Sequence, residues 1–199
     1  MFLSVCSQKL KDLVFVLDES RSVTSGNFDK MKYAVKNFIR YADIDGGKVR
    51  VGINVFGTAS EIAFNLNTYN NKNDIFAAID SINYKGSDDT TNTRAALDSM
   101  RFNMFTVDRG DRPDAADIAI VITDGRSSSD PIPSADAARN AGIHIIAIGI
   151  GDDVDSDELE GIANKPSEDN VFTIDGFDQL DGLEEKVYTA ICGKTIKFN

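Results

Sequence analysis

The segment Leu13-Val14-Phe15-Val16-Leu17 and the residues that follow it, Asp18-Glu19-Ser20-Arg21-Ser22, decide the fold. No polar residue interrupts the apolar run, which is typical of a short strand buried on both faces of a sheet. Such a strand delivers one acid and two hydroxyls to the carboxyl edge of the sheet, where open α/β folds bind ligands. Because these donors are oxygens with no Cys or His nearby, they favour Mg²⁺, Mn²⁺ or Ca²⁺ over zinc or copper.

Strands and helices alternate along the rest of the chain. Apolar runs predict further strands at Val49–Phe56, Ser60–Phe64, Ala116–Thr123, 143–148 and Val171–Ile174. Apolar residues at helical spacing predict helices at 28–41, 75–82, 92–100 (beginning at Asn92 or Thr93), 133–141, 155–162 and 177–191. Gly149-Ile150-Gly151 is predicted to be a turn, since it lacks the third spaced glycine of a nucleotide-binding loop.

This order of elements predicts an α/β fold, with a doubly wound, Rossmann-like, mostly parallel sheet and helices on both faces. The connection between Val49–Phe56 and Ser60–Phe64 is too short for a helical crossover. These two strands should therefore pair as an antiparallel hairpin at one edge of the sheet. We expect a single domain over residues 1–199, with a core at about 11–192 and short terminal extensions.

The composition argues against several classes of protein. Of the 199 residues, 42% are hydrophobic, which is enough for a full core, and the formal net charge is −11. A chain this acidic lacks the basic face that nucleic acid or an anionic membrane requires. No apolar run approaches the roughly 18 residues of a membrane span, and residues 1–5 are too few for a signal peptide, so a secreted form would be a mature or excised piece. The charge suits a divalent cation or a partner that carries Lys and Arg.

The chain has two cysteines, Cys6 and Cys192, one near each end. The termini of doubly wound folds often lie close together, so a disulfide between these residues is expected. Such a bond would indicate an oxidising, extracellular setting. The alternative is two unrelated buried thiols.

Two further segments bring oxygen donors to the same predicted edge. Thr91 lies in an oxygen-rich loop just before a helix, and Asp124 follows the apolar strand Ala116–Thr123. In a sheet wound outward from its first strand, the first and fourth strands are neighbours at the switch point. Asp18 and Asp124 should therefore meet there, with Thr91 arriving from the helix that leads into the fourth strand.

Together these motifs resemble the von Willebrand factor type A domain. They are D-x-S-x-S from Asp18, T-x-T from Thr91 and T-D-G from Thr123, and the resemblance runs from about Lys11 to Cys192. The flanking cysteines are similar to those of the extracellular-matrix branch of the family, such as matrilins and collagen-associated A domains. The resemblance implies a secreted protein of the extracellular matrix.

The resemblance also implies a metal-ion-dependent adhesion site. Ser20, Ser22 and Thr91 would bind the cation directly, while Asp18 and Asp124 would act through water or through hydrogen bonds to the hydroxyls. Neutral hydroxyl ligands leave the cation poorly neutralised, so a carboxylate from another protein can complete its coordination. We therefore expect Mg²⁺, or Mn²⁺ or Ca²⁺, to bridge this chain to an acidic residue of a matrix protein, with collagen the leading candidate.

Other functions compete with metal-dependent adhesion. A structural matrix protein that self-associates, with the metal incidental, would bind its partner without a cation. An enzyme is not expected, because a phosphotransferase needs a second acid where Ser20 stands, and a serine hydrolase needs a nucleophile elbow and a usable His. An intracellular A domain would carry reduced cysteines.

Several residues have plainer interpretations. Glu19, Arg21, Asp88 and Asp89 surround the metal motifs, so we expect them on the ligand-binding rim, although Asp88 and Asp89 also suit a solvated loop. Thr91 and Thr93 are also candidate N-caps, and the segments at Asp18 and Asp124 would serve as ordinary turns if they did not meet.

Two further patterns invite functional interpretations. Arg109-Gly110-Asp111 matches the integrin-recognition tripeptide, but it lies in a turn that is charged throughout. His144 lies in an apolar strand and is expected in the core or on a face of the sheet, not in catalysis.

Overall fold

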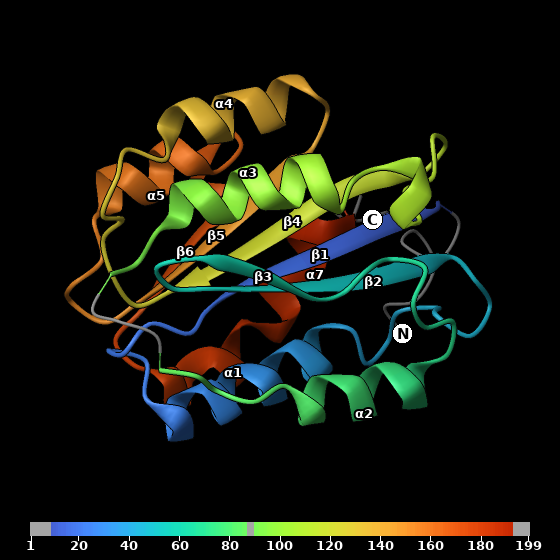
Figure 1. Cartoon of the computed structure of the whole chain (residues 1–199), viewed down its shortest axis with the longest axis horizontal. Coiled ribbons are helices and arrows are strands. Elements are labelled where there is room, and N and C mark those ends of the chain that lie inside the picture. Colours follow the sequence, from blue (N-terminus) through green and yellow to red (C-terminus); the bar gives the residue numbers. More distant parts are fainter. Residues whose placement is uncertain (1–8, 87–89, 193–199) are drawn as a thin grey trace, which may run out of the picture.

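The structure, a computed structural model, describes residues 9–86 and 90–192, which form a six-stranded sheet between two layers of helices (Figure 1). The strands are β1 (Lys11–Asp18), β2 (Val49–Phe56), β3 (Ser60–Phe64), β4 (Ala116–Thr123), β5 (His144–Ile150) and β6 (Val171–Ile174). Their order across the sheet is β3-β2-β1-β4-β5-β6, and every pair is parallel except β2 with β3. The predicted doubly wound sheet with one antiparallel edge strand is therefore confirmed.

Helices cover both faces of the sheet. They are α1 (Ser25–Phe38), α2 (Lys72–Ser81), α3 (Thr93–Asn103), α4 (Ile132–Asn140), α5 (Ser156–Ile162), α6 (Ser167–Asn170), α7 (Glu184–Cys192) and the 3₁₀ segments η2 (Val107–Arg109) and η3 (Phe177–Leu183). In Figure 1, α1, α2 and α7 pack on one face, while α3, α4 and α5 pack on the other. None of the helices in the described part of the chain is both long enough and apolar enough to cross a membrane.

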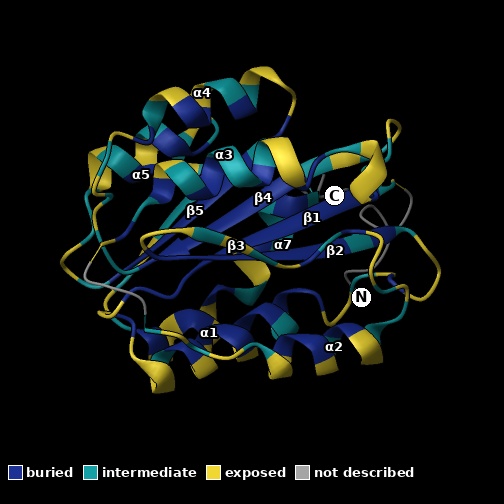
Figure 2. Ribbon diagram, viewed as in Figure 1, coloured by how far each residue is buried: buried dark blue, intermediate teal, exposed yellow. Residues whose placement is uncertain are grey.

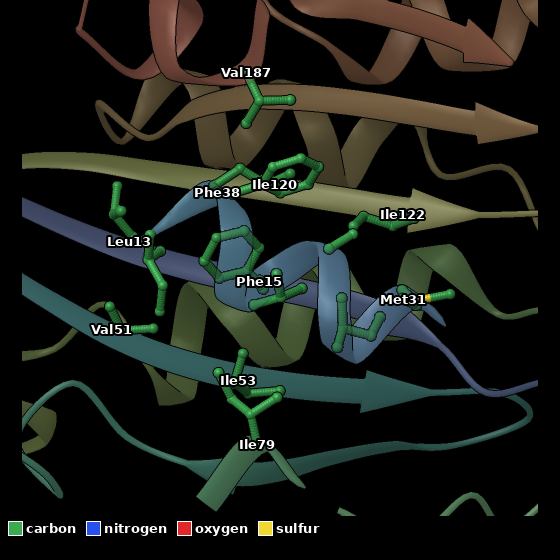
Figure 3. Packing of buried hydrophobic residues seen from close by; sticks show 14 of the residues in the cluster. Leu13, Phe15, Met31, Phe38, Val51, Ile53, Ile79, Ile120, Ile122 and Val187 are labelled. Carbon is green, nitrogen blue, oxygen red and sulfur yellow. The ribbon is translucent and has the colours of Figure 1, made fainter. Parts of the chain in front are cut away.

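Strand β1 is buried on both faces because its side chains alternate between two cores (Figure 2). Leu13, Phe15 and Leu17 belong to the core beneath α1 and α7, where Figure 3 shows Phe15 beside helix α1. Val14 and Val16 belong to the core beneath α3 and α4. An unbroken apolar run is the sequence signature of this double burial.

The predicted turn at Gly149-Ile150-Gly151 is wrong for its first two residues, which are the end of β5. A Cβ at Gly149 would lie 2.4 Å from Leu159 Cδ1, so the glycine allows α5 to pack directly on the strand. The turn begins only at Gly151, where φ is +83°.

The predicted helix at 177–191 is two elements, η3 followed by α7. Gly182, a poor helix former, lies in the 3₁₀ segment just before α7 begins. The short helix α6 and the 3₁₀ turn η2 were not predicted, since each is too short to show a helical period.

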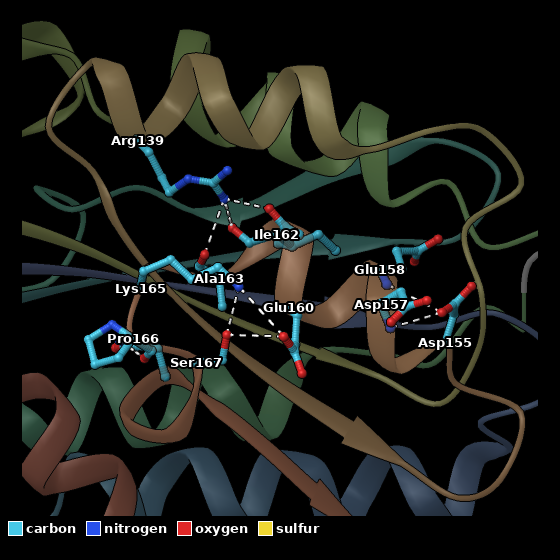
Figure 4. Close-up of polar contacts among 12 residues, drawn as sticks. Arg139, Asp155, Asp157, Glu158, Glu160, Ile162, Ala163, Lys165, Pro166 and Ser167 are labelled. Atoms are coloured by element: carbon cyan, nitrogen blue, oxygen red, sulfur yellow. Dashed lines mark hydrogen bonds and ion pairs between the residues drawn. The ribbon is translucent and has the colours of Figure 1, made fainter.

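Helix α5 is held at both ends (Figure 4). Asp155 is the N-cap, and its side chain accepts hydrogen bonds from the backbone N–H groups of Asp157 and Glu158. At the other end Arg139, from α4, donates to the carbonyl oxygens of Gly161, Ile162 and Ala163. These contacts fix the segment that connects β5 to α5 at the carboxyl edge of the sheet.

Candidate functional site

The structure brings four of the predicted metal ligands together at the carboxyl edge of the sheet, the left-hand edge in Figure 1. Strands β1 and β4 are neighbours, with Leu17 opposite Ile122. Asp18 and Asp124 follow these positions, and the hydroxyls of Ser20 and Ser22 lie between them. Two segments separated by about a hundred residues in sequence thus build one polar site.

Asp18 is fully buried, and both of its carboxylate oxygens accept hydrogen bonds. One oxygen accepts from the backbone N–H of Ser20 at 2.8 Å, and the other from the Thr123 hydroxyl at 2.6 Å. Thr123 is a site residue that the sequence analysis did not assign, although the T-D-G motif contains it. Its hydroxyl fixes the orientation of Asp18 from the neighbouring strand.

The two serine hydroxyls continue this chain of hydrogen bonds. The Ser22 hydroxyl donates to Asp124 Oδ1 at 2.8 Å, and its oxygen lies 3.0 Å from the Ser20 hydroxyl. Since a serine has one hydroxyl hydrogen, Ser20 is the donor to Ser22. Oxygen donors from Asp18 to Asp124 are therefore ordered in one connected array.

Thr91 lies against the loop that carries Asp124. Its hydroxyl oxygen is 3.4 Å from the position that a Cβ on Gly125 would take, and its carbonyl accepts from the N–H of Ser128 at 2.7 Å. Thr91 is 7% exposed. The fifth predicted ligand thus lies against the loop that carries Asp124, on a third segment of the chain.

Neither Thr91 nor Thr93 caps α3. The N-cap is Asn92, whose side-chain oxygen accepts from the N–H of Ala95 at 3.1 Å. Thr93 is the first residue of the helix and is fully buried, and its hydroxyl has no partner among the described residues. Because Asn92 satisfies the helix end, Thr91 is not needed for capping.

The site concentrates negative charge in a buried place. Burial raises the pKa of Asp18, although hydrogen bonds from Thr123 and Ser20 oppose the shift. Burial also raises the pKa of Asp124 to about 6, with a hydrogen bond from Ser22 lowering it and the charge of Asp18 raising it. A bound cation would favour both ionised carboxylates, and all the donors are oxygens, so these residues fit a divalent metal.

Residues next to the site connect the segment that follows β1 to residues 84–85. The Tyr84 hydroxyl donates to the carbonyl oxygen of Ser20 at 3.0 Å, and Glu19 Oε2 accepts from the N–H of Lys85 at 3.3 Å. Glu19 is only 4% exposed, and burial raises its pKa. The expectation that Glu19 lies on the ligand-binding rim is therefore wrong, because its carboxylate is turned inward to hold the backbone at Lys85.

The remaining rim residues are placed unevenly. Arg21 is exposed, and Asp88 and Asp89 lie outside the described residues, so the place of all three on the ligand-binding rim stays a prediction. Cys6 also lies outside the described residues, so its disulfide with Cys192 stays a prediction.

The acid of the Arg109-Gly110-Asp111 tripeptide is half-buried. Gly110 adopts a φ of +99° and ends η2, and the Oδ1 atom of Asp111 is buried without a hydrogen-bond partner. His144 begins β5 half-buried, and its Nε2 lies 2.6 Å from Asn170 Oδ1, which agrees with a place on the sheet.

A second acidic cluster lies at the opposite, amino edge of the sheet. Asp12, Asp111 and Asp117 place carboxylate oxygens within 4.8 Å of one another, and Asp12 pairs with Asp117 in the register of β1 and β4. Burial, followed by the charge of Asp111, raises the pKa of Asp117 to about 7. This cluster is distinct from the metal motifs, and no sequence motif predicts it.

Arg112 anchors this amino edge. Its guanidinium binds the buried carboxylate of Asp12 at 2.6 Å and donates to the carbonyl oxygens of Lys11, Gly47 and Lys48. The contacts join the start of β1 to the turn before β2.

Comparisons with known proteins agree with this geometry. The family model described as the von Willebrand factor type A domain matches residues 12–186. The chain is 31% identical to matrilin-2 of Mus musculus over 192 residues, which are 95% of this chain and 20% of that protein. It is 33% identical to the collagen alpha-4(VI) chain of Mus musculus, over 94% of this chain and 8% of that protein. The chain thus spans a minor part of these relatives' lengths.

Solved structures show the same fold. The proximal thread matrix protein 1 from the mussel byssus, determined with a zinc-occupied MIDAS motif, superimposes with a TM-score of 0.87 and 28% identity. The match covers 92% of this chain and 48% of that one. With a family model that spans most of its length, three motifs that meet at one edge of the sheet, and this structural likeness, the chain belongs to the von Willebrand factor type A domain family.

Proposed function

We propose that this chain is an extracellular adhesion module that binds a matrix protein through a divalent cation held by Asp18, Ser20, Ser22, Thr91 and Asp124. The observation that carries this proposal is the hydrogen-bonded array from Asp18 through both serines to Asp124. An array of ordered oxygens at a topological switch point is expected of a cation-binding site. A fold that binds nothing at this position would not need such an array.

Some of these residues would bind the cation, and the others would orient its ligands. The hydroxyls of Ser20, Ser22 and Thr91 would bind the cation, while Asp18 and Asp124 orient the hydroxyls and hold water. Thr123 would keep Asp18 in place through its 2.6 Å hydrogen bond. When bound, the cation supplies a Lewis-acid position for a carboxylate of the partner.

The relatives support an extracellular location and a protein-binding function. Matrilin and collagen VI chains are among the proteins that match nearly the whole chain, and the mussel protein is named as a matrix protein. We therefore propose secretion into the extracellular matrix, protein binding without catalysis, and collagen as the first partner to test.

The donor set limits the candidates for the cation. Oxygen donors alone favour Mg²⁺, Mn²⁺ or Ca²⁺. The zinc in the MIDAS motif of the mussel protein adds Zn²⁺ as a fourth candidate, since zinc also accepts oxygen ligands. We propose Mg²⁺ as the resident ion, with Zn²⁺ included in every comparison.

The test is binding to immobilised collagen in Mg²⁺ or in EDTA. The wild type should bind in Mg²⁺ and lose at least about tenfold in affinity in EDTA, the loss expected when a buried charge pair across an interface is broken. Ser22→Ala should bind weakly in both buffers, because it removes a ligand and the hydrogen bond to Asp124. Ser156→Ala, an exposed serine on α5, is the matched control and should behave as the wild type.

Binding that persists in EDTA would contradict the proposal and would favour a structural matrix protein with an incidental metal. Absence of binding to collagen, together with cation-dependent capture of another matrix protein, would keep the mechanism and change the partner.

A further inference from the structure

Thr91 belongs to no helix or strand, unlike Asp18, which ends β1. It stands two residues before α3 begins, and its carbonyl oxygen accepts a hydrogen bond from the N–H of Ser128 at 2.7 Å. Ser128 lies in the loop that follows Asp124. The position of Thr91 relative to Asp124 therefore depends on how this loop is held.

A short part of that loop, residues 126–129, supports the start of α3. Besides the contact of Ser128 with Thr91, the Ser129 hydroxyl donates to Asn92 Oδ1 at 3.1 Å. Asn92 is the N-cap of α3, so the loop contacts two successive residues at this point. A shift of the loop would move Thr91 relative to the other predicted metal ligands.

Helix α5 holds this loop through its first turn, where Figure 4 shows Asp155 and Glu158. The N–H of Ser127 donates to both carboxylate oxygens of Glu158, at 3.1 and 3.2 Å. Arg126 pairs with Asp155, but the Arg126 side chain is 69% exposed, and exposed ion pairs contribute little. Glu158 is half-buried, and a hydrogen bond to an ionised acceptor is roughly twice as strong as a neutral one. Glu158 is therefore the stronger of the two contacts between α5 and the loop.

Helix α5 is itself fixed on the sheet. Leu159 is 1% exposed and packs against Gly149 of β5, while Arg139 binds the carbonyl oxygens at the other end of the helix. Glu158 thus connects a firmly packed helix to a loop that has no regular structure of its own.

We propose that Glu158 is a positioning residue for the metal site, which fixes where Thr91 lies relative to Asp124 by holding the loop 126–129. The inference rests on the proposed function, since it concerns the same cation. Residues that orient metal ligands without touching the ion typically contribute about 10–100-fold to metal affinity. The effect passes through the backbone of the loop, so it needs no contact between Glu158 and the cation.

The test is titration of the whole chain with MnCl₂, followed by the electron paramagnetic resonance signal of the free ion. Glu158→Ala should weaken the affinity for Mn²⁺ about tenfold, because the loop loses its anchor. Glu158→Gln should stay within about threefold of the wild type, since its amide oxygen still accepts a weaker hydrogen bond from Ser127.

Asp157→Ala is the matched control, because it removes an exposed acid from the same turn of α5. It should bind Mn²⁺ as the wild type does. The Tm of each variant is measured without a cation in parallel, so that a loss of stability is separated from a loss of affinity.

Several results would overturn the inference and leave the metal-dependent function standing. Wild-type affinity in Glu158→Ala would show that the loop needs no anchor, whatever happens to the Tm. Equal weakening in Glu158→Ala and Glu158→Gln, or in Asp157→Ala, would show that negative charge attracts the ion from a distance. A wild type that binds no Mn²⁺ would instead overturn both the inference and the proposed function.

Discussion

Thr123 shows what single residues contribute to this site. The sequence predicted Asp18, Ser20, Ser22 and Asp124 because acids and hydroxyls stood at the ends of apolar runs. It gave no role to Thr123, since one threonine at the end of a strand is ordinary in a sheet. Only the pairing of β1 with β4 reveals that its hydroxyl meets the buried Asp18 carboxylate.

Thr123→Val should destabilise the protein and weaken cation binding together. Valine keeps the shape of threonine but leaves Asp18 with one donor fewer in a buried place, which costs about 1–3 kcal/mol. Urea unfolding with and without Mg²⁺ measures both effects. Thr173→Val, at an exposed position of β6, is the control and should change little. A variant as stable as the wild type would show that the hydrogen bond is not needed.

Asp117 predicts a dependence of stability on pH. Its pKa is raised to about 7, mainly by burial and then by the charge of Asp111, whereas an unfolded aspartate has a pKa of about 4. Between these values the folded chain holds a proton that the unfolded chain has lost. The free energy of unfolding therefore falls as the pH rises from about 4 to about 7.

Asp117→Asn should abolish this fall and stabilise the protein at pH 8 by about 1–2 kcal/mol, a figure reduced for solvent screening of a half-buried group. At pH 5 the variant should be close to the wild type. Thermal unfolding across the pH range is the measurement. Asp114→Asn, which removes an exposed acid nearby, should leave the profile unchanged, and a similar effect of both variants would argue against the cluster.

Helices and strands were predicted correctly where the hydrophobic pattern extends over enough residues to be recognised. Strands β1, β2, β3, β4 and β6 agree with their apolar runs. The end of β5 was missed because glycine is a turn signal locally, whereas here Gly149 makes room for Leu159 of α5. That reason is a contact between elements, which a local pattern does not contain.

Gly149→Ala should therefore destabilise the protein by about 1–3 kcal/mol, because the new methyl group overpacks the contact with Leu159. Gly26→Ala is the opposite case in α1, where nothing lies within 4 Å and alanine is the better helix former, so a gain of up to about 1 kcal/mol is expected. Chemical denaturation of both variants tests the pair. Equal stability would mean that α5 moves freely away from β5.

At the scale of the whole molecule, topology made the metal site predictable. The rule that ligands bind at the switch point joins segments from β1, β4 and the start of α3 without any knowledge of side chains. No comparable rule predicts the cluster of Asp12, Asp111 and Asp117. Its formation depends on the register of β1 and β4 and on the turn that carries Asp111. The inward turn of Glu19 was likewise invisible, because it depends on where the backbone of Lys85 passes.

Binding of a cation should stabilise the whole fold. A ligand at a hundred times its Kd adds about 2.7 kcal/mol to the free energy of unfolding, or about 5–10 °C in Tm for a chain of this size. MgCl₂ should raise the Tm of the wild type relative to NaCl of equal ionic strength. Asp124→Asn should lose this increase and Asp114→Asn should keep it. An equal increase in all three proteins would place the stabilising ion elsewhere.

The position of Arg112 predicts how harmful substitutions would affect this protein. One guanidinium fastens the end of the sheet that faces away from any ligand, through Asp12 and three main-chain carbonyls. Substitutions of Arg112 or Asp12 should lower the yield of folded protein. The molecules that do fold should bind their target with normal affinity. Substitution of Ser22, whose side chain is exposed at the far end, should do the reverse, so a survey of harmful variants would separate into two populations by the yield of folded protein and by the affinity for the target.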